Sequence, residues 1–113
     1  MIHVYLDDMR PCPKGFIPAH NADECMILLE DCDVNILSLD HDLGWNQKNG
    51  SDVVNWMIEK KRFPKEIYLH SSSLPARKQM YERLYMAKPE EVLLYQIPIP
   101  EAKLYQIATE IRT

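Results

Sequence analysis

The chain has 113 residues, of which 46% are apolar or aromatic, and a formal net charge of −4. This length suits one ordinary domain with a real buried core, so we expect a single domain over residues 1–113. The acidic balance argues against a protein that coats duplex nucleic acid, because such a protein would carry a basic stripe. A small phosphorylated ligand bound by a few local cations remains compatible with it.

The sequence gives no sign of a membrane protein. No apolar stretch approaches the roughly 20 residues that a membrane-spanning helix needs. The first residues predict a strand that leads into acids, which is unlike a signal peptide. The three cysteines are odd in number and lack CxxC spacing, which indicates reduced thiols. We therefore expect a cytoplasmic protein.

Short apolar runs alternate with amphipathic segments along the chain. Short apolar runs predict buried strands, and apolar residues three or four positions apart predict helices. The predicted strands are residues 2–6, 16–20, 34–39, 66–69 and 92–97. Between the first two strands, the prolines and the glycine of residues 11–15 predict a loop in place of a helix.

Local signals predict where each helix begins. Asn21 followed by Glu24 is typical of an N-cap residue with its reciprocal partner. Ser51 is the expected cap of a helix over residues 52–62, and Pro75 is the expected first residue of a helix that reaches Ala87. Pro100 is expected to open the last helix. The apolar stripe of that helix consists of Leu104, Ile107, Ala108 and Ile111.

Five strands alternating with helices predict an α/β fold with a parallel sheet and right-handed crossovers. The commonest order for such a sheet is 2-1-3-4-5, in which strands 1, 3 and 4 are neighbours. Ligands of open α/β sheets bind beyond the carboxyl ends of the strands. Three polar clusters follow these neighbouring strands, namely Asp7-Asp8, Asp40-His41-Asp42 and His70-Ser71.

Four carboxylates this close together repel one another, so basic side chains, raised pKa values or a metal must neutralise some of them. Oxygen ligands suit Mg²⁺ or Mn²⁺. We expect Asp8 and Asp40, helped by Asp7, to hold such a cation. The competing interpretation is that one or two of the acids only cap turns or helix starts.

Other side chains at this edge can transfer protons or bind phosphate. His41 and His70 add imidazole groups that can transfer protons, although either could ligate a metal instead. Ser71 can donate a hydrogen bond. Arg10 and Arg77 follow strands 1 and 4 and suit bidentate phosphate binding, and Arg77 also lies in a helix's first turn, which favours anions. Each arginine alone could equally be a solvated loop residue.

The acid placement resembles a response-regulator receiver domain. Asp7-Asp8 corresponds to the metal-binding acidic pair of receivers, and Asp40 to the phosphate-accepting aspartate. Receivers also carry a lysine after strand 5, and residues 95–98 contain none. His70-Ser71 takes the place of the Thr or Ser that receivers keep after strand 4.

The chain is more similar to the receiver-derived family of cyclic-phosphate-processing receiver domains. The matching motifs are Leu6-Asp7-Asp8-x-Arg10-x-x-Pro13, Ser38-Leu39-Asp40-His41-Asp42-Leu43-Gly44, Gly50-x-Asp52-x-x-x-Trp56, His70-Ser71 and Arg77-x-x-Met80. The resemblance implies a receiver-like fold, in which the Pro-rich loop of this chain replaces the usual first helix. It also implies hydrolysis of a cyclic or related phosphoester.

The leading hypothesis is a metal-dependent phosphoesterase for a small cyclic phosphate. In it, Asp7, Asp8 and Asp40 hold the metal, and Asp7 or Asp42 orients the attacking water. Arg10, Arg77 and Ser71 bind the phosphate, and His41 or His70 protonates the leaving oxygen. The first alternative is a non-catalytic module that binds a phosphorylated ligand or a protein. The second is a phosphorelay receiver with Asp40 as acceptor. Tyr105 on the last helix could extend a homodimer surface.

Overall fold

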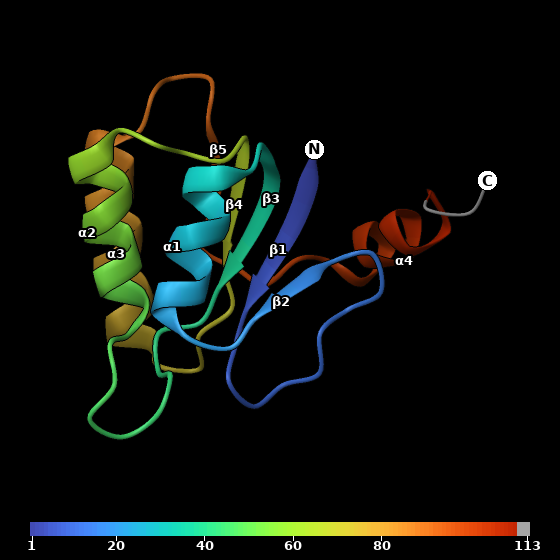
Figure 1. Cartoon of the computed structure of the whole chain (residues 1–113). Coiled ribbons are helices and arrows are strands. Elements are labelled where there is room, and N and C mark those ends of the chain that lie inside the picture. Colours follow the sequence, from blue (N-terminus) through green and yellow to red (C-terminus); the bar gives the residue numbers. More distant parts are fainter. Residues whose placement is uncertain (111–113) are drawn as a thin grey trace.

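The computed structural model describes residues 1–110, which form a five-stranded parallel sheet in the order β2-β1-β3-β4-β5 (Figure 1). The predicted strand order is therefore confirmed. The strands are β1 (Ile2–Leu6), β2 (Ile17–Ala19), β3 (Val34–Leu39), β4 (Glu66–Leu69) and β5 (Leu93–Tyr95). The helices are α1 (Ala22–Asp31), α2 (Gly50–Lys60), α3 (Leu74–Ala87) and α4 (Glu101–Glu110).

The helices are divided unequally between the two faces of the sheet. Figure 1 shows α1, α2 and α3 together on one side of the sheet and α4 on the other. Residues 7–16, which connect β1 to β2, contain no helix, so the predicted loss of the first helix is confirmed. This loop begins at the carboxyl end of β1, where the candidate site lies.

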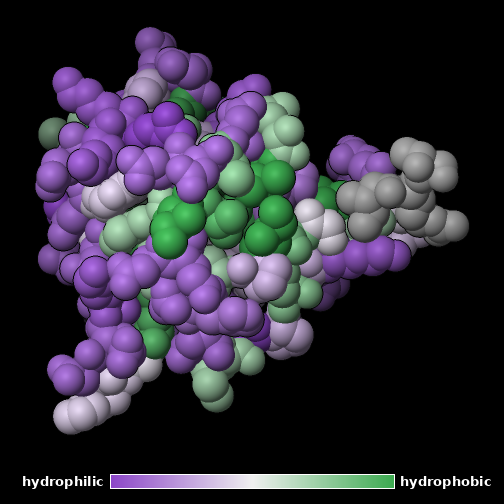
Figure 2. All heavy atoms as spheres, in the orientation of Figure 1, coloured by the Kyte–Doolittle hydropathy of each residue, from purple (hydrophilic) through white to green (hydrophobic). Residues whose placement is uncertain are grey.

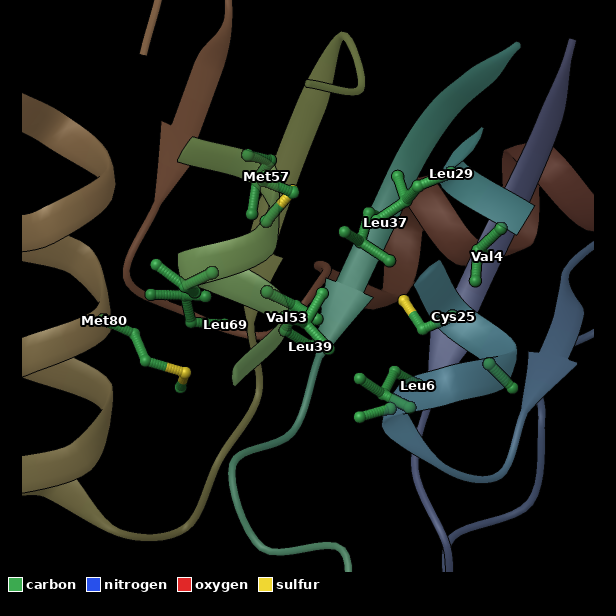
Figure 3. Packing of buried hydrophobic residues seen from close by; sticks show 14 of the residues in the cluster. Val4, Leu6, Cys25, Leu29, Leu37, Leu39, Val53, Met57, Leu69 and Met80 are labelled. Carbon is green, nitrogen blue, oxygen red and sulfur yellow. The ribbon is translucent and has the colours of Figure 1, made fainter. Parts of the chain in front are cut away.

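The main core lies between the sheet and the three-helix layer (Figure 3). Alternation along β1, β3 and β4 turns Leu6, Leu39 and Leu69 toward these helices, and each of the three is 0% exposed. Met57 of α2 and Met80 of α3 close the core from the helical side, also at 0% exposure. Each of these three strands ends at one of the buried leucines. The leucines therefore fix the positions of the polar residues that follow them.

A second, smaller core lies under α4. Ile107 of α4 packs with Phe16, Ile36 and Tyr68 on the opposite face of the sheet. Leu104 and Tyr5 pack against the same group and are partly buried. The predicted inward stripe of the last helix is therefore confirmed at Leu104 and Ile107, and its member Ile111 lies outside the described residues.

Several predicted boundaries were wrong, including both ends of the strand predicted over residues 16–20, which is β2 over Ile17–Ala19. Asn49, not Ser51, caps α2, because the side chains of Asn49 and Asp52 bond each other's backbone N–H in a capping box. The same helix ends at Lys60 rather than at residue 62, since Lys61 adopts a left-handed conformation. Helix α3 begins one residue before Pro75, behind the cap Ser73, and β5 covers only residues 93–95 of the predicted 92–97.

Most of the surface seen in Figure 2 is polar. Apolar residues on this side gather near its centre. Ile17 of β2 and Ile27 of α1 are among the exposed large apolar residues of the domain. Among residues 1–110, no helix is long and apolar enough to cross a membrane.

Candidate functional site

The strand register places three chemically active side chains in one row. Tyr5, Ser38 and Tyr68 are register partners across β1, β3 and β4. Residues two positions further along a strand point to the same face. Asp7, Asp40 and His70 each stand two positions further, and one ligand atom from each lies within 4.8 Å of the others. The sequence-based prediction that these strand ends converge is therefore confirmed for these three residues.

Asp7 is a buried carboxylate that accepts hydrogen bonds from four donors. Its Oδ1 accepts from the backbone N–H groups of Met9 (2.8 Å) and Arg10 (2.9 Å). Its Oδ2 lies 2.9 Å from both Arg10 Nη1 and His70 Nε2. Burial alone would raise the pKa of Asp7, but these hydrogen bonds outweigh burial and lower the pKa to about 2. Asp7 is therefore ionised at neutral pH.

His70 is held between Asp7 and Ser38. Burial lowers the pKa of His70, although the hydrogen bond to Asp7 opposes this effect, so the environment favours the neutral ring. Because an ionised carboxylate only accepts, Nε2 carries the proton and donates to Asp7. Nδ1 is then an acceptor, and the Ser38 hydroxyl donates to it at 2.6 Å. Tyr5 stacks on the ring with centroids 4.5 Å apart, which fixes the plane of the imidazole.

Arg10 connects the two central carboxylates. Its Nη1 lies 2.9 Å from Asp7 Oδ2 and 3.4 Å from Asp40 Oδ2. Burial, followed by the negative charge of Asp7, raises the pKa of Asp40, and the backbone N–H of His41 and the charge of Arg10 oppose that rise. We call Asp7, Arg10, Asp40 and His70 the carboxyl-edge cluster.

The start of α2 holds the backbone that carries Asp40. The N–H of Gly50 donates to the carbonyl of His41 at 2.8 Å. A Cβ at Gly50 would overlap the Asp40 carbonyl oxygen and lie 3.0 Å from the Met80 sulfur. Only glycine allows the helix to approach the Asp40-His41 segment this closely.

The family model described as the cyclic-phosphate processing receiver domain matches residues 2–86, which include the whole carboxyl-edge cluster. The chain belongs to this family. The fold and the family expected from the sequence are thus confirmed, and the domain is a receiver-like module related to cyclic phosphate processing. No match was found among curated proteins.

The receiver domain keeps the remaining predicted site residues near the edge but outside the cluster. Asp8 is half-buried, and its Oδ2 lies beside Gly44. His41 keeps 20% of its side chain exposed and lies 3.7 Å, Nδ1 to Oδ1, from the almost fully exposed Asp42. Ser71 is buried, and its hydroxyl accepts from the N–H of Ser73 (3.2 Å) at the start of α3.

Arg77 lies in the first turn of α3, as predicted, and differs from Arg10 in its contacts. Its Nε is buried and has no hydrogen-bond partner among residues 1–110. A buried N–H without a partner is rare in folded proteins and calls for a ligand or water. Arg77 therefore has an uncommitted but buried N–H, whereas Arg10 is already engaged by the carboxylates of this receiver domain.

Sequence reasoning missed Ser38 and Tyr5. Both lie inside predicted strands, and neither was assigned a role in the site, although Ser38 belongs to a matching motif. A hydroxyl in the interior of a buried strand needs a hydrogen-bond partner. The position of Ser38 could therefore have indicated a polar neighbour such as His70. Its position two residues before Asp40 places it on the face of the cluster.

The donor set fits a divalent metal only if two existing interactions change. Two carboxylates and one imidazole within 4.8 Å form an acceptable first set of ligands. However, Arg10 contacts the Oδ2 atoms of both carboxylates, and Nε2 of His70 carries the proton that Asp7 accepts. A metal at this position therefore requires Arg10 to move away, and it requires the ring proton of His70 to shift to Nδ1, where Ser38 can accept it.

Proposed function

We propose that this receiver domain binds a small cyclic phosphate ester at the carboxyl edge of its sheet and hydrolyses one ester bond of the ring. The observation that carries the proposal is the convergence of Asp7, Arg10, Asp40 and His70 within a family described by cyclic phosphate processing. This cluster combines carboxylates with a cation of the geometry that phosphate requires.

Hydrolysis joins a water oxygen to phosphorus and breaks one phosphorus–oxygen bond of the ring. One proton leaves the water, and another must reach the departing ester oxygen. We assign Asp40 to orient the water and accept its proton, because its Oδ2 has only the 3.4 Å contact with Arg10. We assign His41 as proton donor, because His70 is 7% exposed and already bonded at both nitrogens. Asp42, close to the His41 ring, helps to orient it.

The phosphate group is bound from the two loops that flank the cluster. Arg77 carries an unpartnered, buried Nε–H at the start of α3 and would have to turn its guanidinium outward to reach the phosphate. The helix N-terminus there also favours anions. Arg10 keeps 43% of its side chain exposed and can reach an incoming phosphate. Ser71 follows β4 and contributes its hydroxyl.

Mg²⁺ or Mn²⁺ would be held by Asp7 and Asp40, whose oxygens converge. When bound, it would polarise the phosphoryl oxygen and lower the pKa of a coordinated water. The side chains derived above bind, orient and move protons around that position. The metal requirement is therefore a separate question for experiment.

Phosphorus-31 NMR on a panel of 2′,3′-cyclic nucleotides, 3′,5′-cyclic nucleotides and small five-membered cyclic phosphates tests the proposal. Each substrate is incubated with and without Mn²⁺. We expect ring opening of at least one substrate. Loss of a proton-transferring group costs about 10²–10⁴ in rate, so Asp40→Asn and His41→Gln should both lose about 10² or more in turnover. Asp33→Asn, at an exposed position before β3, is the matched control. Full activity in both site variants would refute the assignment.

A non-catalytic binding module is the second candidate, and one observation favours it. Asp7 already accepts hydrogen bonds from four donors of the protein itself, which is typical of a structural carboxylate. Saturable binding of a cyclic phosphate without turnover, under every metal condition of the panel, would select this candidate.

A further inference from the structure

We propose that Arg10 is the built-in counter-cation of the carboxyl-edge cluster, and that a divalent metal can enter only by displacing its guanidinium. This inference rests on the metal-binding part of the proposed function. It adds that Arg10 acts in two successive positions, first between the carboxylates and then on the phosphate.

The first argument is the charge around the two carboxylates. Asp7 and Asp40 have side chains that are 0% and 9% exposed, and each lies against Nη1 of Arg10. Two buried carboxylates this close repel each other unless a cation lies between them. Arg10 therefore supplies the positive charge between the two carboxylates.

The second argument is that the guanidinium and a metal compete for the same oxygens. Arg10 Nη1 contacts the Oδ2 atoms of Asp7 and Asp40 at 2.9 and 3.4 Å. A metal ligated by both residues would stand beside the same nitrogen and repel it. The cluster thus holds one of the two cations at a time.

The third argument is that Arg10 can leave without unfolding its loop. Its backbone N–H is fixed to Asp7 Oδ1 at 2.9 Å, so the Cα stays at the edge of the site. Its side chain is 43% exposed, and a long flexible stem lets the guanidinium rotate outward. In the outward position the planar group can bind two oxygens of a phosphate. Displacement by the metal therefore supplies the site with a phosphate-binding arm.

The test is a titration of Mn²⁺ into the full chain without substrate, followed by electron paramagnetic resonance of free Mn²⁺. Arg10→Gln removes the competing charge and keeps a polar side chain. Exposed ion pairs contribute little free energy and buried ones contribute more. The metal no longer has to break the half-exposed Arg10 pairs in this variant, so we expect its Mn²⁺ affinity to rise about 10-fold. Arg83→Gln, at an exposed position of α3, removes the same charge away from the cluster and should leave the affinity within about 2-fold.

A second titration measures inorganic phosphate binding to the Mn²⁺-loaded proteins by calorimetry. Arg10→Gln should weaken it about 10-fold, since one charge-assisted contact is lost. Arg10→Lys keeps the charge but not the planar fork, and should restore Mn²⁺ competition more fully than phosphate binding.

Circular dichroism confirms that each variant is folded before titration. Unchanged or weaker Mn²⁺ binding in Arg10→Gln would overturn the inference, and so would the absence of Mn²⁺ binding by every variant up to millimolar concentration. If Arg10→Gln binds Mn²⁺ more tightly while the parent chain hydrolyses no cyclic phosphate, the inference stands and the proposed hydrolysis fails.

Discussion

Asp7→Asn should lower the free energy of unfolding at neutral pH. It should also remove the part of the pH dependence of stability that comes from the Asp7 carboxyl. The substitution keeps the size of the side chain and keeps an oxygen that can accept from the N–H groups of Met9 and Arg10. It replaces the oxygen that faces Arg10 Nη1 and His70 Nε2 with an amide that donates. Two charge-assisted bonds are lost, and donors then face donors.

The pKa of Asp7 sets the magnitude. Its carboxyl has a pKa of about 2 in the folded chain, against an ordinary value of 3.8. Each unit of depression corresponds to 1.36 kcal/mol, so the ionised side chain stabilises the fold by about 2 kcal/mol. Because the folded pKa is the lower one, this stability is fully present above about pH 4 and is lost as pH falls toward about 2.

Urea unfolding followed by tryptophan fluorescence measures both effects. We expect Asp7→Asn to lower the free energy of unfolding by about 2–3 kcal/mol at pH 7. The difference from the parent chain should shrink between pH 4 and pH 2.5. Asp33→Asn, at an exposed position, should stay within about 0.5 kcal/mol throughout. If Asp7→Asn matches the parent at pH 7, or if the difference persists unchanged in acid, the assignment of Asp7 as the depressed carboxyl is incorrect.

Two further substitutions test the supports of the site. Ser38→Ala leaves Nδ1 of buried His70 without a donor. It should lower the free energy of unfolding by about 1–3 kcal/mol and shift the imidazole nitrogen-15 resonances. Ser72→Ala, at an exposed position, should do neither. An unshifted His70 spectrum in Ser38→Ala would contradict the hydrogen bond. Gly50→Ala forces α2 off the Asp40 carbonyl and should cost about 1–3 kcal/mol in a thermal melt. An unchanged melting temperature would show that the helix does not pack that closely.

The sheet order and the convergence of the cluster were predictable because both follow from strand periodicity. Asp7, Asp40 and His70 each directly follow a buried leucine at the end of a strand. Parallel pairing aligns the leucines, and therefore it also aligns these three residues. Predicting this alignment required no information about side-chain rotamers. The sequence also placed Arg10 on the correct edge.

The contacts within the cluster could not be predicted in the same way. The choice of Arg10 between a carboxylate and a phosphate depends on distances of a few ångströms, which strand spacing does not fix. The cap of α2 was misplaced because Ser51 and Asn49 are both good N-cap residues. What distinguishes them is the spacing of Asn49 to Asp52, which forms the capping box, and the close approach of Gly50 to Asp40.

The most direct test of the central claim is a proton–nitrogen-15 correlation spectrum of the full chain, titrated with the cyclic phosphate that binds best in the presence of Mg²⁺. The account predicts that the shifted amides lie after β1, β3 and β4, at residues 7–10, 40–42 and 70–77. A cavity of about 450 Å³ lined by Asp31, Lys61 and Phe63 provides the internal comparison, because it includes none of these amides. Shifts confined to that cavity, or no shifts at the three strand ends, would contradict the claim that the carboxyl edge is the binding site.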